Sequence, residues 1–133
     1  MEIELAVVGA HLSGMPLNVE LTSRGARLLR AVETLPEYRL FALAGGPPRR
    51  PGLLRVSAGQ GHAIATEVWA LKTEAFGSFV AGVPAPLGIG TTRLADGTTP
   101  KGFIVEPEGI KGAEDISRFG GWRAYIKSLE EAV

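Results

Sequence analysis

The stretch IELAVVGAHLSGMPLN, residues 3–18, joins an apolar run to a loop that contains His11, one of two histidines in the chain. The apolar part alternates little between polar and apolar residues, which is typical of a central strand buried on both faces. Gly9, Gly14 and a proline in the second part predict a loop at the end of that strand. Because pockets form beside such loops, residues 9–18 are a candidate functional site.

The length and composition of the chain narrow the class of protein. Its 133 residues, 45% hydrophobic and 21% charged, predict one globular domain that covers residues 1–133. Fourteen basic residues balance fourteen acidic ones, so we expect neither nucleic acid nor a membrane surface as a partner. Cysteine is absent, which excludes disulfides and thiolate chemistry. With acidic residues at the start and no apolar run of about 18 residues, we expect a cytoplasmic protein.

Glycines and prolines, 18 and 9 of them, cut the remaining sequence into short segments and favour strands over a helical bundle. Residues 90–105 predict a hairpin that turns at Asp96 and Gly97, with Pro100 in an edge strand or at a bulge. Three further segments predict strands: 38–43, 52–57 and 62–71.

Helical spacing marks two other segments. Residues 73–83 predict a short helix with Thr73 as its N-cap, and residues 119–133 predict an amphipathic C-terminal helix. Residues 19–35, preceded by Asn18 as a possible N-cap, are ambiguous and favour a helix weakly by pattern. The order of elements predicts an α+β fold: a mixed, mostly antiparallel, barrel-like sheet with a short helix and a C-terminal helix. The apolar stripe of the last helix comprises Trp122, Tyr125, Ile126 and Leu129.

His11 allows two interpretations from its position alone. A histidine at a strand end is satisfied by a loop carbonyl, or it transfers protons, since its ordinary pKa lies near neutrality. We expect His62 at the surface. We expect Glu67 on an exposed strand face and Glu74 in the first turn of a helix, where its charge interacts favourably with the helix dipole. Acid or base catalysis is the alternative role for either residue. The candidate cations for binding an acidic substrate are Arg39, Arg118, Arg123 and Lys101, of which Lys101 is preferred.

Five segments resemble the C-terminal domain of allophanate hydrolases, in the same order and at similar separations. They are VVGAHLSGMPLN (7–18), YRLFAL (38–43), VPAPLGIGT (83–91), KGFIVEP (101–107) and DISRFGGWRAYI (115–126). The resemblance implies a γ-glutamylcyclotransferase-like fold, and it implies that residues 25–34 form a strand instead of a helix. It also implies that the loop after the first strand helps to build the site.

The resemblance further implies a reaction: decarboxylation of N-carboxycarbamate, or a related small N-carboxylate, downstream of an amidase in urea and allophanate breakdown. His11 would then be the general acid that protonates the carbamate nitrogen. Loop backbone at Gly9, Ala10 and Leu12 would bind the small anionic substrate, together with the Asn18 amide and the Lys101 ammonium group. We expect no metal and no cofactor.

Other functions remain open at this point. The serine-rich signature and catalytic lysine of the amidase part are missing, so we expect that this chain does not hydrolyse allophanate alone. A non-catalytic accessory or oligomerisation domain is one alternative, with a separately encoded amidase or a second copy as its partner. A γ-glutamylcyclotransferase-like enzyme is another, although the loop reads GAHLSG where those enzymes have Tyr-Gly-Ser/Thr-Leu.

Overall fold

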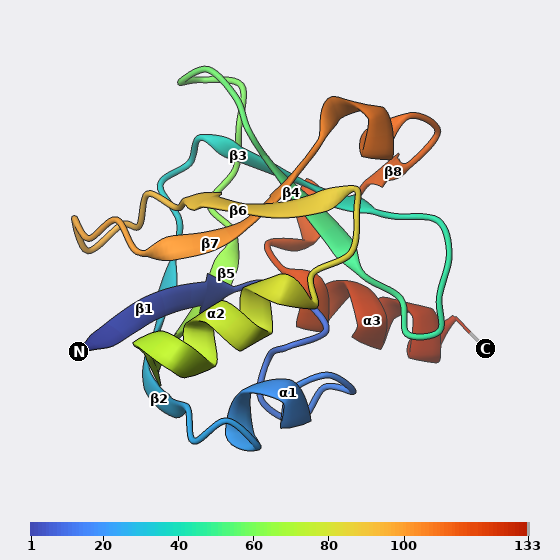
Figure 1. The fold of residues 1–133 in the computed structure, drawn as a ribbon. Coiled ribbons are helices and arrows are strands. Elements are labelled where there is room, and N and C mark those ends of the chain that lie inside the picture. The colour runs from blue at the N-terminus through green and yellow to red at the C-terminus, as the bar shows by residue number, and fades with distance from the viewer. Residues whose placement is uncertain (133) are drawn as a thin grey trace.

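Two β-sheets form the centre of the computed structural model, which describes residues 1–132 (Figure 1). The larger sheet has five strands in the order β2 (Arg27–Glu33), β5 (Ala65–Lys72), β1 (Glu2–Val7), β7 (Lys101–Val105) and β6 (Leu87–Thr91). The central strand β1 is parallel to β7, and all other neighbours are antiparallel. The predicted central strand at the N-terminus is therefore confirmed.

The second sheet is smaller and has the order β4 (Pro51–Arg55), β3 (Tyr38–Ala42) and β8 (Glu114–Asp115). Both of its pairings are antiparallel. Among residues 1–132 no ladder joins the ends of the five-stranded sheet, so the sheet is open instead of closed into a barrel. The predicted α+β class with a mixed, mostly antiparallel sheet is confirmed.

Within residues 1–132 the fold also has three α-helices and two 3₁₀ turns: α1 (Val19–Thr22), α2 (Thr73–Ala81), α3 (Trp122–Glu131), η1 (Pro107–Ile110) and η2 (Ser117–Phe119). Helix α2 follows β5 directly and packs beside β1 and β5, whereas α3 lies at the opposite end of the molecule from the start of β1 (Figure 1). No helix among the described residues is long and apolar enough to cross a membrane.

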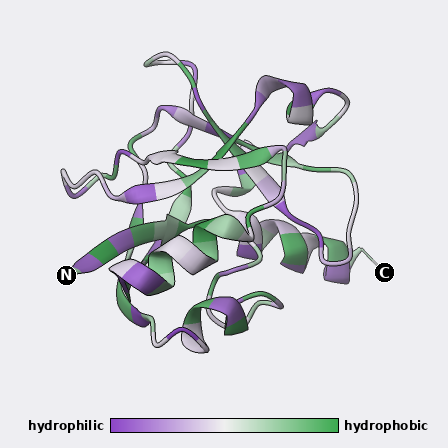
Figure 2. Ribbon diagram, viewed as in Figure 1, coloured by the Kyte–Doolittle hydropathy of each residue, from purple (hydrophilic) through white to green (hydrophobic). Residues whose placement is uncertain are grey.

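Apolar side chains from both sheets and the two longer helices meet in one main core. The hydrophobic colour in Figure 2 accordingly runs along the strands that cross the middle of the molecule. Burying one such side chain stabilises the fold by about 1.5–3 kcal/mol. Core members with 2% exposure or less include Leu5, Val7, Leu21, Tyr38, Leu40, Leu53, Ile64, Leu71 and Ile116.

The segment that the sequence left ambiguous contains both kinds of structure. Residues 19–22 form the single turn α1, and residues 27–33 form β2, so the strand implied by the family resemblance is confirmed over most of its length. Asn18 occupies the N-cap position of α1, but its side chain makes no capping hydrogen bond because the amide donates to the His11 carbonyl instead. Pairing with β5 overrides the weak helical pattern of β2.

Several local predictions are wrong in detail. Lys72, not Thr73, occupies the N-cap of α2, and the Thr73 hydroxyl donates to the Met1 carbonyl. The hairpin of β6 and β7 exists, with Asp96 and Gly97 in its connecting loop. Pro100, however, precedes a strand that is paired on both sides, so it lies neither in an edge strand nor at a strand bulge.

The predicted strand at residues 62–71 begins later, at Ala65. His62 forms only an isolated bridge to Tyr38 and is exposed, as expected. In the C-terminal helix, which begins at Trp122, the predicted stripe is buried unevenly: Trp122 and Tyr125 belong to the core, while Leu129 is 37% exposed. Residue 133 lies outside the described residues.

Candidate functional site

The loop that follows β1 is held close to the second sheet. At Gly9 a Cβ atom would overlap the ring of Pro51, so only glycine lets the two segments approach this closely. Gly14 has a φ of 80°, a conformation that favours glycine. Hydrogen bonds from Leu12 N–H to the Gly9 carbonyl and from Leu17 N–H to the Ala10 carbonyl, 3.0 and 2.8 Å long, fold the loop back on itself. The His11 side chain is thereby directed inward.

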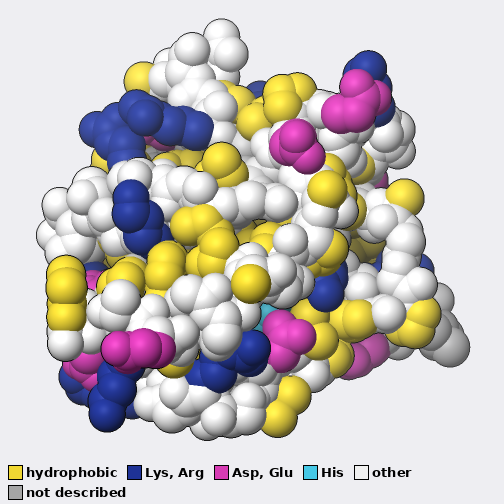
Figure 3. Space-filling model, in the orientation of Figure 1, with side chains coloured by type: hydrophobic (Ala, Val, Ile, Leu, Met, Phe, Trp, Pro, Cys, Tyr) yellow, Lys and Arg dark blue, Asp and Glu magenta, His cyan; other side chains and the backbone are white. Residues whose placement is uncertain are grey.

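His11 lies between two aromatic rings and is 6% exposed. Its ring stacks on Phe103 of β7 at 5.1 Å between centroids and meets the edge of Phe79 of α2 at 5.0 Å. On the face shown in Figure 3, histidine correspondingly reaches the surface only as a small area between larger side chains. These contacts fix the plane of the imidazole.

One nitrogen of the imidazole has a fixed partner. His11 Nε2 lies 2.7 Å from the Glu20 carboxylate of α1, so the neutral ring donates its Nε2–H there. That tautomer leaves Nδ1 as an acceptor, and among residues 1–132 no group forms a hydrogen bond with Nδ1. The arrangement combines a carboxylate that orients the ring with a second nitrogen left for another partner.

The electrostatic surroundings keep His11 neutral at pH 7. Burial is the largest influence and lowers the pKa of the imidazole below its usual value of 6.5. The hydrogen bond and the negative charge of Glu20 oppose this effect, while the positive charge of Arg50 adds to it. Any anion that binds beside Arg50 therefore favours protonation of His11.

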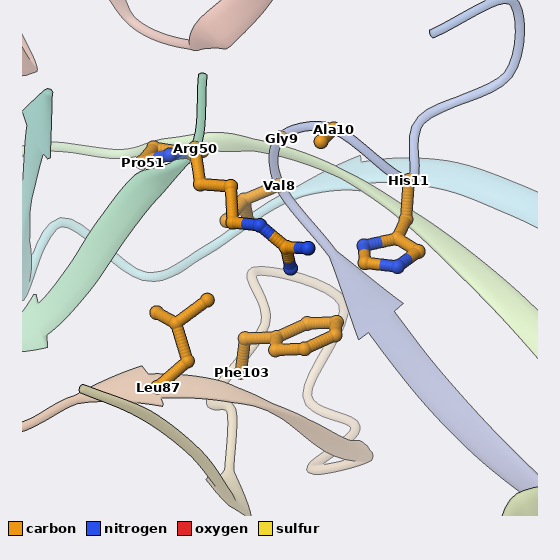
Figure 4. Close-up of a pocket in the computed structure, with 8 residues that line it drawn as sticks. All are labelled: Val8, Gly9, Ala10, His11, Arg50, Pro51, Leu87 and Phe103. Atoms are coloured by element: carbon orange, nitrogen blue, oxygen red, sulfur yellow. The ribbon is translucent and has the colours of Figure 1, made fainter. Parts of the chain in front are cut away.

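A small pocket opens beside the ring, and we call it the inner pocket. Its volume of about 20 Å³ admits one group of the size of a water molecule. Figure 4 shows the Arg50 guanidinium group extending toward the His11 ring, with Leu87 and Phe103 on the other side of the space. The complete lining is Val8, Gly9, Ala10, His11, Arg50, Pro51, Leu87 and Phe103.

A model of the allophanate hydrolase C-terminal domain matches residues 3–127. The chain belongs to the allophanate hydrolase C-terminal domain family. The urea amidolyase of Saccharomyces cerevisiae is 46% identical over 132 residues, which are 97% of this chain and 7% of that protein. The family region is thus a small fraction of the curated relatives that it matches.

Solved structures agree with this family. A Kluyveromyces lactis allophanate hydrolase has a TM-score of 0.93 at 42% identity, over 97% of this chain and 22% of that one. A uropathogenic E. coli-specific protein has a TM-score of 0.87 at 32% identity, over 96% of this chain and 97% of that one. A γ-glutamyl cyclotransferase, 10% identical with a TM-score of 0.61 over 86% of this chain and 70% of that one, shares the fold. The implied γ-glutamylcyclotransferase-like fold is therefore confirmed.

In this member of the allophanate hydrolase C-terminal domain family, the structure brings together Gly9, Ala10 and His11. The other predicted site residues lie elsewhere. Leu12 lines a different cavity, beside Glu67 and Trp122, and the Asn18 amide supports the loop through the His11 carbonyl. Lys101 is exposed, near Thr91, and is not among the residues that line the inner pocket. Among the residues that line the inner pocket, Arg50 is the cation.

Sequence reasoning missed two residues of the site, Arg50 and Glu20. Arg50 is one of two adjacent arginines in a glycine- and proline-rich loop, and no local pattern separates it from its neighbour. Glu20 follows His11 by nine residues, a spacing that corresponds to no regular element. A turn that brings α1 back against the loop makes the contact, so the only available signal was the presence of a carboxylate shortly after the histidine.

The expected exposed position of Glu67 is wrong, because this residue is 8% exposed. It accepts hydrogen bonds from Ser13, Trp69 and Arg123. Burial raises the pKa of Glu67, but the hydrogen bonds from these three residues outweigh it and hold the pKa below 4.5. Glu67 therefore remains ionised at neutral pH and organises the loop.

The other charged residues named from the sequence either form ion pairs or are exposed to solvent. Arg39 pairs with Asp115 at 2.7 Å, and Arg118 pairs with Glu114 at 3.3 Å. Glu74 is exposed in the first turn of α2. Among residues 1–132 no three histidine or carboxylate side chains cluster closely enough to hold a metal ion.

Proposed function

We propose that this domain removes CO2 from N-carboxycarbamate or a related small N-carboxylate, with His11 as the proton donor. One observation carries the proposal. The His11 ring is held by Glu20 through Nε2 and borders, together with the Arg50 guanidinium, a pocket that admits one small group. A proton donor and a carboxylate-binding cation are the two groups that this reaction requires.

The proposed step conserves atoms and charge. The C–N bond to one carboxylate breaks, CO2 leaves, and the electron pair of that bond remains on nitrogen. The imidazolium of His11 donates its Nδ1 proton to this nitrogen, so the dianion becomes the carbamate monoanion and the ring becomes neutral. Solvent then returns a proton to the ring. The step requires neither a metal nor another cofactor.

Substrate charge supplies the protonation state that the step needs. In the empty site, burial and the positive charge of Arg50 lower the pKa of His11 against the opposing effect of Glu20. A dianion bound at Arg50, beside the inner pocket, opposes this effect by Coulombic attraction, and Arg50 reduces the cost of placing that dianion in a partly buried site. The general acid is thus formed when substrate is bound, while the empty site stays neutral.

The experiment compares rates of CO2 release. Substrate is generated in the cuvette by an allophanate-cleaving amidase that lacks this domain, and release is followed with and without the protein. We expect an acceleration of about a hundredfold or more over buffer, the usual contribution of general acid catalysis. His11→Gln should remove it, whereas His62→Gln, at an exposed histidine, should not. Equal rates with protein and with buffer, in samples shown to be folded, would refute the proposal.

A second candidate is an accessory domain that docks on a separate amidase. The supporting observation is that the matching regions of the relatives form 7% of a urea amidolyase and 22% of an allophanate hydrolase structure. Co-purification with an amidase, together with no acceleration of CO2 release, would favour this function. Light scattering would show whether the chain pairs with a second copy. We still expect the protein in the cytoplasm. The alternative of a γ-glutamylcyclotransferase activity is supported only by the shared fold.

A further inference from the structure

A larger space lies next to the inner pocket, and we call it the outer cavity. Its volume is about 260 Å³, just below the range of about 300–1,000 Å³ found for small-molecule sites. Arg50 and Leu87 line both spaces, so the two are adjacent, and we call them together the cleft. The walls come from the loop between β3 and β4 and from the loop before β6. Apart from Arg50, the side chains that line the outer cavity are apolar: Leu43, Ala44, Pro47, Pro48, Pro84, Ala85, Pro86 and Leu87.

Arg50 stands at the junction of the two spaces without an acidic partner. It is half-buried, and among the described residues no carboxylate lies within ion-pair distance of it. Arg39, Arg93 and Arg123, although each is more than a third exposed, all pair with a carboxylate at 3.0 Å or less. A partly buried guanidinium that faces a cavity and lacks a counter-charge is suited to an anionic ligand.

We propose that the cleft selects carboxylates that carry an apolar substituent. The carboxylate binds Arg50 at the junction, its reacting end reaches the inner pocket beside His11, and the substituent lies against the prolines of the outer cavity. This inference deepens the proposed function and rests on it for the chemistry: the preferred substrate would be an N-carboxylate substituted with an apolar group. N-carboxycarbamate itself has no apolar part with which to displace water from these walls.

The test measures binding of two unreactive dianions by titration calorimetry at neutral pH. Malonate replaces the substrate nitrogen with CH2, and benzylmalonate adds an apolar ring of the same net charge. We expect benzylmalonate to bind at least tenfold more tightly, because its ring buries apolar surface in the outer cavity. Leu43→Asn, which places an amide in that cavity without changing charge, should reduce this preference to about threefold or less.

Arg50→Gln should weaken both ligands at least tenfold, since the carboxylate loses a charged hydrogen-bond donor. Arg49→Gln is the matched control: it is adjacent and exposed, it removes the same charge, and it should change neither affinity more than about twofold. Equal affinities of the two ligands, or a preference that Leu43→Asn leaves intact, would overturn the inference. The two ligands do not react, so this binding result does not depend on whether His11 is a catalyst. Conversely, equal binding of the two ligands would not contradict the proposed release of CO2 from N-carboxycarbamate.

Discussion

Ser13 and Glu67 are joined by two hydrogen bonds of 2.7 Å, one from the Ser13 N–H to Oε1 and one from the Ser13 hydroxyl to Oε2 of Glu67. Arg123 of α3 donates to the same carboxylate at 3.0 Å and to the Ser13 carbonyl at 2.6 Å. The loop that contains His11 is thus fastened to β5 and α3 two residues after the histidine. Distant parts of the chain therefore determine where the imidazole lies.

Glu67→Gln should destabilise the fold by about 2 kcal/mol at pH 7, because charged hydrogen bonds are replaced and the new amide N–H group faces donors. The native pKa of Glu67 is below 4.5, so its contribution is complete above that pH and is lost as pH falls through the native pKa. Urea unfolding at pH 7 and at acid pH measures both effects. Glu74→Gln, at an exposed carboxylate, should change stability by less than about 0.5 kcal/mol.

Local patterns predicted most of the longer elements but not β2, and the partners of charged side chains depend on tertiary structure. The apolar run of β1 and the hairpin of β6 and β7 follow from residue order. Glu67 alternates with its neighbours as an exposed strand residue would, yet the His11 loop and α3 cover that face of β5. The sequence favoured Lys101 as the cation and did not mark Arg50, which the approach of β4 to the Gly9 loop brings to the pocket.

His11 should make the protein less stable as pH falls below about 6.5. Its native pKa is lowered by burial, so the unfolded chain takes up a proton at a higher pH than the folded one. The stabilisation is present above 6.5 and is lost as pH falls toward the native pKa. Unfolding free energies between pH 5 and 7.5 should decline less steeply in His11→Gln than in the wild type. An identical decline in both proteins would contradict the burial argument.

Glu20→Gln should lower the pKa of His11 further, because the Glu20 carboxylate raises it through a hydrogen bond and through its charge. A chemical-shift titration of the two histidine rings measures this directly, with His62→Gln as a background that leaves one ring signal. For the proposed reaction, the decline of kcat/KM with rising pH should move to lower pH. Glu108→Gln, at an exposed glutamate, is the control. An unchanged His11 pKa would mean that Glu20 only packs against the ring.

Ser117→Ala should cost about 1–3 kcal/mol of stability. The Ser117 hydroxyl accepts the buried N–H of Leu40 at 2.8 Å and donates to Asp115 at 2.6 Å, so it links β3 to η2. Removal leaves the Leu40 N–H without its partner in a dry environment. Thermal or urea unfolding, compared with Ser57→Ala at an exposed serine, checks this value. Equal stabilities of the two variants would show that water replaces the hydroxyl.

Gly9→Ala should disturb the site through Arg50. The added methyl group would overlap the ring of Pro51, so either the loop or the start of β4 must shift. Such overpacking costs about 1–3 kcal/mol of stability. Since Arg50 precedes Pro51 directly, the same shift moves the guanidinium relative to His11, and malonate affinity should fall together with stability.

Gly77→Ala is the contrasting control for this change. Gly77 lies inside α2, where a Cβ meets no atom within 4 Å, so alanine should stabilise the helix by about 0.5–1 kcal/mol. Comparing the two variants separates the general effect of adding a methyl group from its effect at the loop. If Gly9→Ala kept both wild-type stability and malonate affinity, close approach of Pro51 would not be what sets the distance between Arg50 and His11.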